Sequence, residues 1–221
     1  MKAMCNVEVR KLPYNTPHVH HHENGAWKLL TITDLLKEYG AVFLTSPRVR
    51  FRTPITFLLP FVKKHNGIIG KVNPSHKTVD VTHPNVYRVF NLSHVAKTYQ
   101  NGSILSEDAL LLVNNSAIYT TMLEPLRACA LKWKCIAPAG ATKRTVKPVG
   151  RTHTHRYEMS IFTLLMYRIF GDKWSLDTHV QDLMNRTYEL VSSSHANDHL
   201  WAHFCNPPKK EVNCKKNESK C

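Results

Sequence analysis

The chain has 221 residues, of which 43% are hydrophobic, and it carries 30 Lys and Arg against 16 Asp and Glu. A chain of this length can bury a core without disulfides or metals, so we expect one domain with appendages. The formal charge of +14 argues against an enzyme of small neutral metabolites and favours a protein that contacts phosphates.

Two patterns argue against a protein that spans a membrane or is exported through a signal peptide. The longest apolar runs, such as residues 161–166, are far shorter than the ~20 residues that a bilayer span needs. The first twenty residues contain no apolar stretch of signal-peptide length. We therefore expect a cytoplasmic or nuclear protein, or a virion component, that is not secreted through a signal peptide.

Six cysteines are spaced irregularly along the chain. A chain of this size without an export signal usually keeps its thiols reduced, buried or bound to metal. We expect no disulfide framework, and we place Cys129 and Cys135 in the core because they are too far apart for a Cys-x-x-Cys redox pair.

The first half of the chain opens with residues 1–26, where prolines, clustered histidines and an Asn-Gly pair indicate a flexible arm. A helix is predicted from Thr33 or Asp34 to Gly40. The predicted elements that follow are a strand over 48–52, a helix over 55–62 kinked or delayed by Pro60, and strands over 79–81 and 86–90.

The second half has stronger helix signals. Ser106, followed by two acids, is a good N-cap for the apolar residues 109–113, and residues 117–133 are helical in content but interrupted by Pro125. A loop is predicted over 137–148, a strand over 151–157 and an apolar element over 160–170 closed by Gly171. The clearest amphipathic helix starts near Ser175 or Asp177 and continues to residue 191.

These elements predict an α+β fold. We expect a single compact domain over residues 27–205, with a β-rich middle packed by helices. The arm over 1–26 precedes it, and a disordered Lys-rich tail over 206–221 follows it.

The basic residues gather in two blocks that contain no acid, residues 39–79 and 125–157. Such segregation predicts a one-sided electropositive surface. The candidate nucleic-acid-binding residues in these blocks are Arg48, Arg50, Arg52, Lys63, Lys64, Lys143, Arg144, Lys147, Arg151 and Arg156.

The first block carries an alternating strand pattern. Arg48, Arg50 and Arg52 would share one face at ~6.6 Å spacing, close to the interval between phosphates along one nucleic-acid strand. Val49 and Phe51 would then face the core. A guanidinium can bind a phosphate through two hydrogen bonds, so the row suits a phosphate backbone; the alternative is a solvated sheet face.

The second block combines cations with hydroxyl donors over residues 141–147 and 151–156, which is typical of phosphate contacts. Phe51, Trp133 and Tyr157 could offer stacking faces for bases, although aromatic residues at such positions more often lie in a core. No signature of a named RNA-binding module is present.

A candidate metal site lies near the C-terminus. His195, His199 and His203 recur every four residues and would share one face of a helix. Together with Cys205, and with Cys214 or Cys221, they would supply the nitrogen and sulfur ligands that zinc prefers. The spacing matches no named zinc finger, and the alternative is three histidines beside free thiols.

The sequence contains no catalytic motif, since a P-loop, a Gly-x-Gly-x-x-Gly turn and a Gly-x-Ser-x-Gly elbow are all missing. We therefore lean away from an enzyme and expect no cofactor, with zinc at the C-terminal cluster as the alternative. In that alternative the chain is a small zinc-assisted hydrolase or nuclease.

In size, charge and a basic middle between flexible ends, the chain is similar to the small matrix, coat or movement proteins of RNA viruses. This likeness is one of composition and assigns no residue a role. The favoured hypothesis is a non-enzymatic structural or interaction protein that binds RNA or nucleoprotein through the two basic blocks. The same surface could contact an anionic membrane, and the chain could form homo-oligomers.

Overall fold

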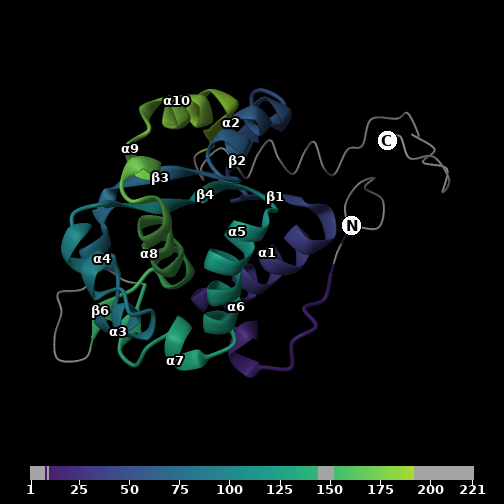
Figure 1. The fold of residues 1–221 in the computed structure, drawn as a ribbon. Helices are drawn as coiled ribbons and strands as arrows, with labels where there is room; N and C mark the ends of the chain where they lie inside the picture. The colour runs from purple at the N-terminus through teal and green to yellow at the C-terminus, as the bar shows by residue number, and fades with distance from the viewer. Residues whose placement is uncertain (1–7, 9, 144–151, 192–221) are drawn as a thin grey trace. The chain divides into compact units, whose positions relative to one another are not determined.

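The computed structural model of the chain describes residues 8, 10–143 and 152–191. Residues 14–190 form one compact unit of helices and strands, which confirms the predicted α+β class (Figure 1). The predicted tail over 206–221 lies outside the described residues. Within the described ranges, no helix is both long and apolar enough to cross a membrane.

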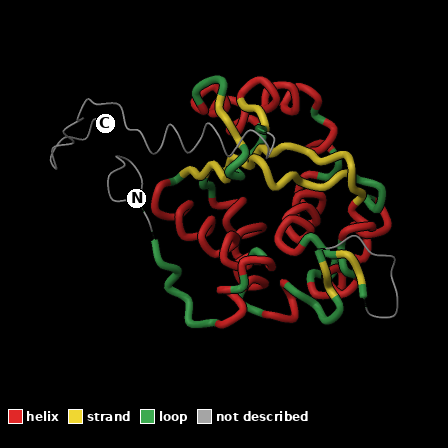
Figure 2. Tube along the Cα trace, turned by 180° about the vertical axis from the view of Figure 1, so that it is seen from behind, coloured by secondary structure: helices red, strands yellow, loops and turns green. Residues whose placement is uncertain are grey.

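A three-stranded antiparallel sheet with the order β1–β4–β3 lies at the centre of this unit. Its strands are β1 (Ala41–Thr45), β3 (Ile68–Lys77) and β4 (Ser103–Val113). Figures 1 and 2 show helices on both sides of the sheet, with α1, α6 and α8 on one side and α2 and α10 on the other. The central strand β4 is therefore covered on both faces.

The predicted helix after Ser106 is wrong, because residues 109–113 form the second half of β4. Residues 109–112 are all buried, and a short apolar run without alternation is typical of a strand covered on both faces. Ser106 does not cap a helix; its hydroxyl donates to Asp108 Oδ2 at 2.9 Å.

Helix α1 (Ala26–Tyr39) covers one face of the sheet and starts earlier than predicted. Asn24 Oδ1 accepts from the backbone N–H of Ala26 at 2.8 Å, so the turn before the helix supplies its first hydrogen bond. Thr33, the predicted start, is buried inside the helix and donates to the carbonyl of Leu29. The predicted end is confirmed, since Gly40 caps the helix with a left-handed φ of 74°.

The same side of the sheet holds α8 (Tyr157–Phe170), which ends at Gly171 as predicted and is buried along nearly its whole length. Beside it lies a continuous helical stretch, which consists of α5 (Ser116–Ile118), a π-helical turn (Tyr119–Leu123) and α6 (Glu124–Ala130). Pro125 lies in the first turn of α6, where its missing N–H costs little, so the stretch continues through it.

The other face of the sheet is covered by a smaller layer. It consists of a 3-10 turn (Ile55–Leu58), α2 (Leu59–Lys64), α10 (Thr178–Thr187) and a two-stranded antiparallel ribbon of β2 (Val49–Phe51) and β7 (Tyr188–Leu190). Its core consists of Leu58, Val62, Ile69, Ala109, Leu111, Val180, Met184 and Tyr188. Asp177 caps α10 as predicted, but the helix ends at Thr187 because residues 188–190 pair with β2 instead.

Two segments predicted as strands are helical, and a third is shorter than predicted. Residues 78–81 form a 3-10 turn (Thr78–Val81), and residues 84–89 form α3 (Pro84–Val89), followed by α4 (Ser93–Thr98). His83 Nδ1 accepts from the N–H of Asn85 at 3.2 Å and Pro84 occupies the first turn, so this segment carries helix-start signals. The strand over 151–157 is reduced to β6 (His153–Thr154), which pairs with β5 (Ala141–Thr142), and Tyr157 begins α8.

The outer edge of β3 is covered by a side chain. Gln181 of α10 accepts from the N–H of Val72 at 2.8 Å and donates to the carbonyl of Gly70 at 3.0 Å. Its carboxamide thus takes both roles that the backbone of a neighbouring strand would take.

The short helix α9 (Lys173–Leu176) lies between α8 and α10 in the sequence. Its Trp174 is buried against Tyr167 of α8.

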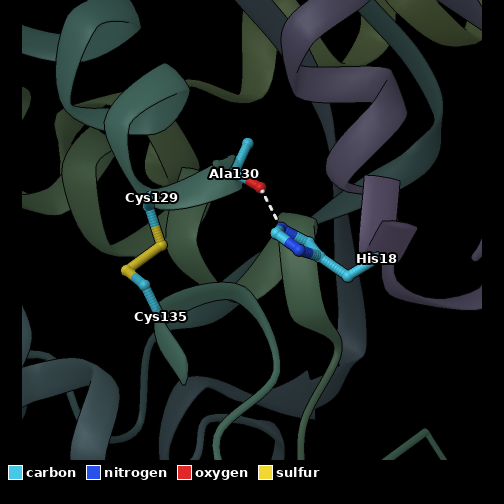
Figure 3. The surroundings of a disulfide bond; sticks show 4 residues. All are labelled: His18, Cys129, Ala130 and Cys135. Atoms are coloured by element: carbon cyan, nitrogen blue, oxygen red, sulfur yellow. Dashed lines mark hydrogen bonds between the residues drawn. A yellow bond between two sulfur atoms is a disulfide. The ribbon is translucent and has the colours of Figure 1, made fainter. Parts of the chain in front are cut away.

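The compact unit begins at Tyr14, so the predicted boundary at residue 27 is too late. Residues 14–25 belong to the unit and contain two 3-10 turns (Pro17–His20 and His22–Asn24). Val19 is fully buried, and His18 Nε2 lies 2.8 Å from the carbonyl oxygen of Ala130 (Figure 3). The prediction of a flexible arm is wrong for this part, because the burial of Val19 and the contact of His18 with α6 hold it to the unit.

Cys129 and Cys135 form a disulfide bond, which corrects the expectation of reduced thiols (Figure 3). Both are buried, as predicted. The chain turns between the end of α6 and the short helix α7 (Trp133–Ile136), and this turn brings the two Cα atoms within 5.2 Å. Sequence spacing alone did not reveal the turn.

Candidate anion-binding site

The three arginines of the first basic block lie on and beside β2, where they are paired with acids. Arg52 Nε donates to Glu189 Oε2 at 3.0 Å, and Arg50 Nη1 lies 3.9 Å from Glu189 Oε1. Glu189 is directly opposite Arg50 in the β2–β7 ribbon. The hydrogen bonds and charge of Arg52, followed by the charge of Arg50, hold the pKa of Glu189 below its ordinary value.

Arg48 has a different partner. Its Nη2 donates to Asp108 Oδ1 at 3.0 Å, and the hydroxyl groups of Ser46 and Ser106 also donate to this carboxylate. The three arginines predicted as a row for phosphates are therefore each paired with an acid. The partners Asp108 and Glu189 come from segments far away in sequence, so an acid-free block of sequence does not make an acid-free surface.

The apolar side of the predicted strand is only half confirmed. Val49 packs against the core under the ribbon, whereas Phe51 is 41% exposed and contacts Phe43 edge to face. The ribbon lies at the rim of the smaller layer, so its second apolar residue reaches past the core.

Arg156 differs from these arginines because no described carboxylate pairs with it. Its Nη2 lies 3.1 Å from His76 Nε2, which places the imidazole nitrogen as acceptor for the guanidinium. Its Nε is buried and has no hydrogen-bond partner among the described residues. The backbone N–H of Arg156 bonds to the carbonyl of Val81 and to Ser160 Oγ, which fixes the start of α8.

Arg48 and Arg156 line one polar hollow of about 180 Å³. We call it the Arg48–Arg156 hollow, and its other lining residues are Asn73, His76, Ile104, Leu105, Ser106, Glu107, Asp108 and Met159. The structure thus brings together one arginine from each acid-free block. The hollow has room for one phosphate group, and guanidinium, imidazole and amide groups surround it.

Two acids also line the hollow, and they act differently. Asp108 is 13% exposed and already accepts from Arg48 and two serines. Glu107 is exposed and forms no ion pair with a described residue. An incoming anion would meet the partly buried guanidinium of Arg156, whereas water screens the repulsion of the exposed Glu107.

His76 and Asn73 were missed by the sequence analysis. They lie in the polar second half of β3, where the register against β4 shifts between Asn73 and Lys77. Irregularities of this kind redirect side chains and often occur beside functional sites. A bulge has no reliable signature in a single sequence, so this geometry could not be predicted.

A buried histidine lies next to Arg156 in sequence. His155 is fully buried, and its ring is near those of His83 and Tyr157. Burial, followed by the charge of nearby His83, lowers the pKa of His155 to about 3. This ring is therefore neutral at physiological pH and packs against His83 and Tyr157.

The remaining predicted residues do not join the hollow. Lys63 and Lys64 are exposed at the end of α2 and line two other clefts. Lys143 Nζ lies 5.8 Å from the ring centre of Tyr157, a cation–π distance that leaves this ring less available for a base. Trp133, which is half exposed, contacts the ring of His18.

Several predictions lie outside the described residues. They are the candidate nucleic-acid-binding residues Arg144, Lys147 and Arg151 and the metal set of His195, His199, His203 and Cys205. Among the residues that the structure does describe, no three His, Cys, Asp or Glu side chains are placed to share a metal ion.

Comparisons with known proteins give no further guide to the site. No protein-family model, no curated protein and no solved structure matches the chain.

Proposed function

We propose that the protein binds RNA, free or within a nucleoprotein, and that the Arg48–Arg156 hollow holds a backbone phosphate. The observation that carries this proposal is Arg156, a guanidinium with a buried Nε and no described carboxylate partner beside a polar hollow. A phosphate oxygen would accept from the guanidinium, and charge-assisted hydrogen bonds of this type are the strong ones.

The formal charge of +14 supports the same proposal at longer range. Exposed lysines attract a polyanion to the surface, while a partly enclosed guanidinium holds one phosphate in place. In this proposal the protein is a non-enzymatic interaction protein acting in the cytoplasm, the nucleus or a virion. Contact with an anionic membrane and formation of homo-oligomers are secondary proposals.

The test replaces Arg156 by glutamine and measures affinity for a fluorescent single-stranded RNA by anisotropy at several salt concentrations. Loss of one charge-assisted contact should weaken binding by about tenfold or more, because such a hydrogen bond contributes roughly 1.5–3 kcal/mol. The slope of log K against log salt should become shallower by about 0.7.

Arg52→Gln is the matched control, since Arg52 is also an arginine but is engaged with Glu189 outside the hollow. It should change the RNA affinity by less than about twofold. Equal losses in both variants would show that only total charge matters. An unchanged affinity in Arg156→Gln would remove the hollow from the proposal, and vesicles of phosphatidylserine that displace the RNA would identify a membrane surface as a competitor.

A further inference from the structure

A second cleft, separate from the Arg48–Arg156 hollow, has a volume of about 600 Å³. We call it the Trp174 cleft. It is lined by residues of α2, β3, the end of α8, α9 and the start of α10. This volume lies within the range of about 300–1,000 Å³ that is typical of small-molecule sites. It shares no lining residue with the hollow.

The lining of the Trp174 cleft is partly apolar and partly polar. Ile68, Ile69, Met166 and Val180 are buried along it, and Leu176 is 66% exposed. Trp174 is almost completely buried, and its indole Nε1 has no hydrogen-bond acceptor among the described residues. A lining that combines apolar side chains with polar and charged ones suits a ligand that has both an apolar body and a polar head.

The charges that line the cleft are mainly positive. Lys64 and Lys173 are exposed and form no ion pair with a described residue. Among the described residues, Asp177 is the one acid in the lining, and it is already engaged. Its Oδ1 accepts from the N–H of Val180 at 3.0 Å, and its Oδ2 lies 3.4 Å from His65 Nε2. Two lysines therefore remain to attract an anion.

We propose that the Trp174 cleft binds a small amphipathic anion, a molecule with an apolar body and one carboxylate or phosphate head. The apolar body lies along β3 and the end of α8, and the head lies between Lys64 and Lys173. Affinity rises with the apolar area that the body covers, and the lysines select the sign of the head. A polynucleotide does not suit this cleft, because its apolar surface is confined to the bases.

A neighbouring cleft provides the control. It has a volume of about 640 Å³ and shares Asn66, Ile169 and Phe170 with the Trp174 cleft. Lys63 lines this neighbour and not the Trp174 cleft, whereas Lys64, the next residue of α2, lines the Trp174 cleft and not the neighbour. Adjacent lysines on one helix therefore distinguish the two clefts.

The experiment titrates the full chain with dodecanoate and with dodecyl phosphate, both below their micelle concentrations, by isothermal titration calorimetry. At least one should bind with a stoichiometry near one, and the tighter of the two identifies the preferred head. Dodecyltrimethylammonium, which has the same chain and a positive head, should bind at least about tenfold more weakly, since it lacks the lysine contacts.

The double variant Lys64→Gln, Lys173→Gln should weaken binding of the anion by about tenfold or more, whereas Lys63→Gln should change it by less than about twofold. Both lysines of the double variant are exposed, and circular dichroism would verify that the fold is retained. Binding should also change the tryptophan fluorescence, and Trp174→Phe should abolish that change.

Three results would overturn the proposal. The first is equal affinity for the cationic and anionic amphiphiles, because the lysines would then select nothing. The second is an equal loss in Lys63→Gln and in the double variant. The third is an absence of binding to monomeric amphiphiles together with binding to phosphatidylserine vesicles, which would assign the lysines to a membrane surface instead.

Discussion

The β2–β7 ribbon and the junction between β6 and α8 both present arginines, but they use them in opposite ways. In the ribbon, Glu189 engages Arg50 and Arg52, and all three side chains lie at the surface. At the junction, Arg156 contacts His76 and has no described carboxylate partner. The difference shows that the number of cations in a block of sequence says less about anion binding than the number left without an acid.

The largest expected effect is a loss of stability at the junction between β6 and α8 when the pH falls. His155 is buried with its pKa lowered to about 3, so the unfolded chain takes up a proton at this residue near pH 6.5 while the folded chain does not. The stability contributed by neutral His155 is present above pH 6.5 and is lost as pH falls from 6.5 towards 3. The melting temperature should therefore decline over this window.

A variant separates this effect from general acid denaturation. His155→Gln cannot titrate, so its melting temperature, although lower at neutral pH, should lose less between pH 6.5 and 5, a window above the usual pKa of carboxylates. A decline as steep as that of the wild-type chain would assign the acid sensitivity to other groups, the remaining histidines first.

The second expected effect compares the two acids that pair with the first block. Asp108→Ala removes a mostly buried carboxylate and leaves two serine hydroxyls and Arg48 without their acceptor. We expect a loss of about 1–3 kcal/mol in the free energy of unfolding, measured by urea denaturation. Glu189→Ala should cost clearly less, because the ribbon pairs are exposed and water screens them. A larger cost for Glu189 would show that the ribbon holds the smaller layer together.

The smallest expected effect is on RNA affinity, when the arginines of the ribbon are left without an acid as Arg156 is at the junction. Glu189→Gln leaves Arg50 and Arg52 without their acid, so the RNA affinity should rise by about threefold at moderate salt. Asp182→Asn serves as the control. Asp182 pairs with Arg186 on the surface of α10, and its substitution removes the same charge as Glu189→Gln. An equal rise in both variants would mean that net charge alone sets the affinity.

Local signals predicted three helix boundaries but not the central sheet. Gly40, Gly171 and the Asp177 cap were read correctly because a helix terminus depends on a few neighbouring residues. The apolar residues 109–113 were assigned to a helix, since whether such a run is a strand depends on what covers its second face. That information lies in α1, α8 and α10, not in the run itself.

The candidate site shows the same limit. Arg48 and Arg156 were predicted as binding residues from their blocks, and the structure places both in one hollow. Their partners could not be predicted, because Asp108 and His76 reach the hollow only through the pairing of β3 with β4 and the shift in its register. The disulfide was missed for a related reason, since the turn after α6 that joins its cysteines depends on tertiary packing.

The carboxamide of Gln181 also has a consequence for the solution behaviour of the protein. An open sheet edge is a template on which a second molecule can add a strand, and growth from such edges leads to aggregates. By bonding to Gly70 and Val72, Gln181 occupies two of the groups that an incoming strand would need. Strand addition at this point therefore requires α10 to move away first, so the helix protects the chain against polymerisation through β3.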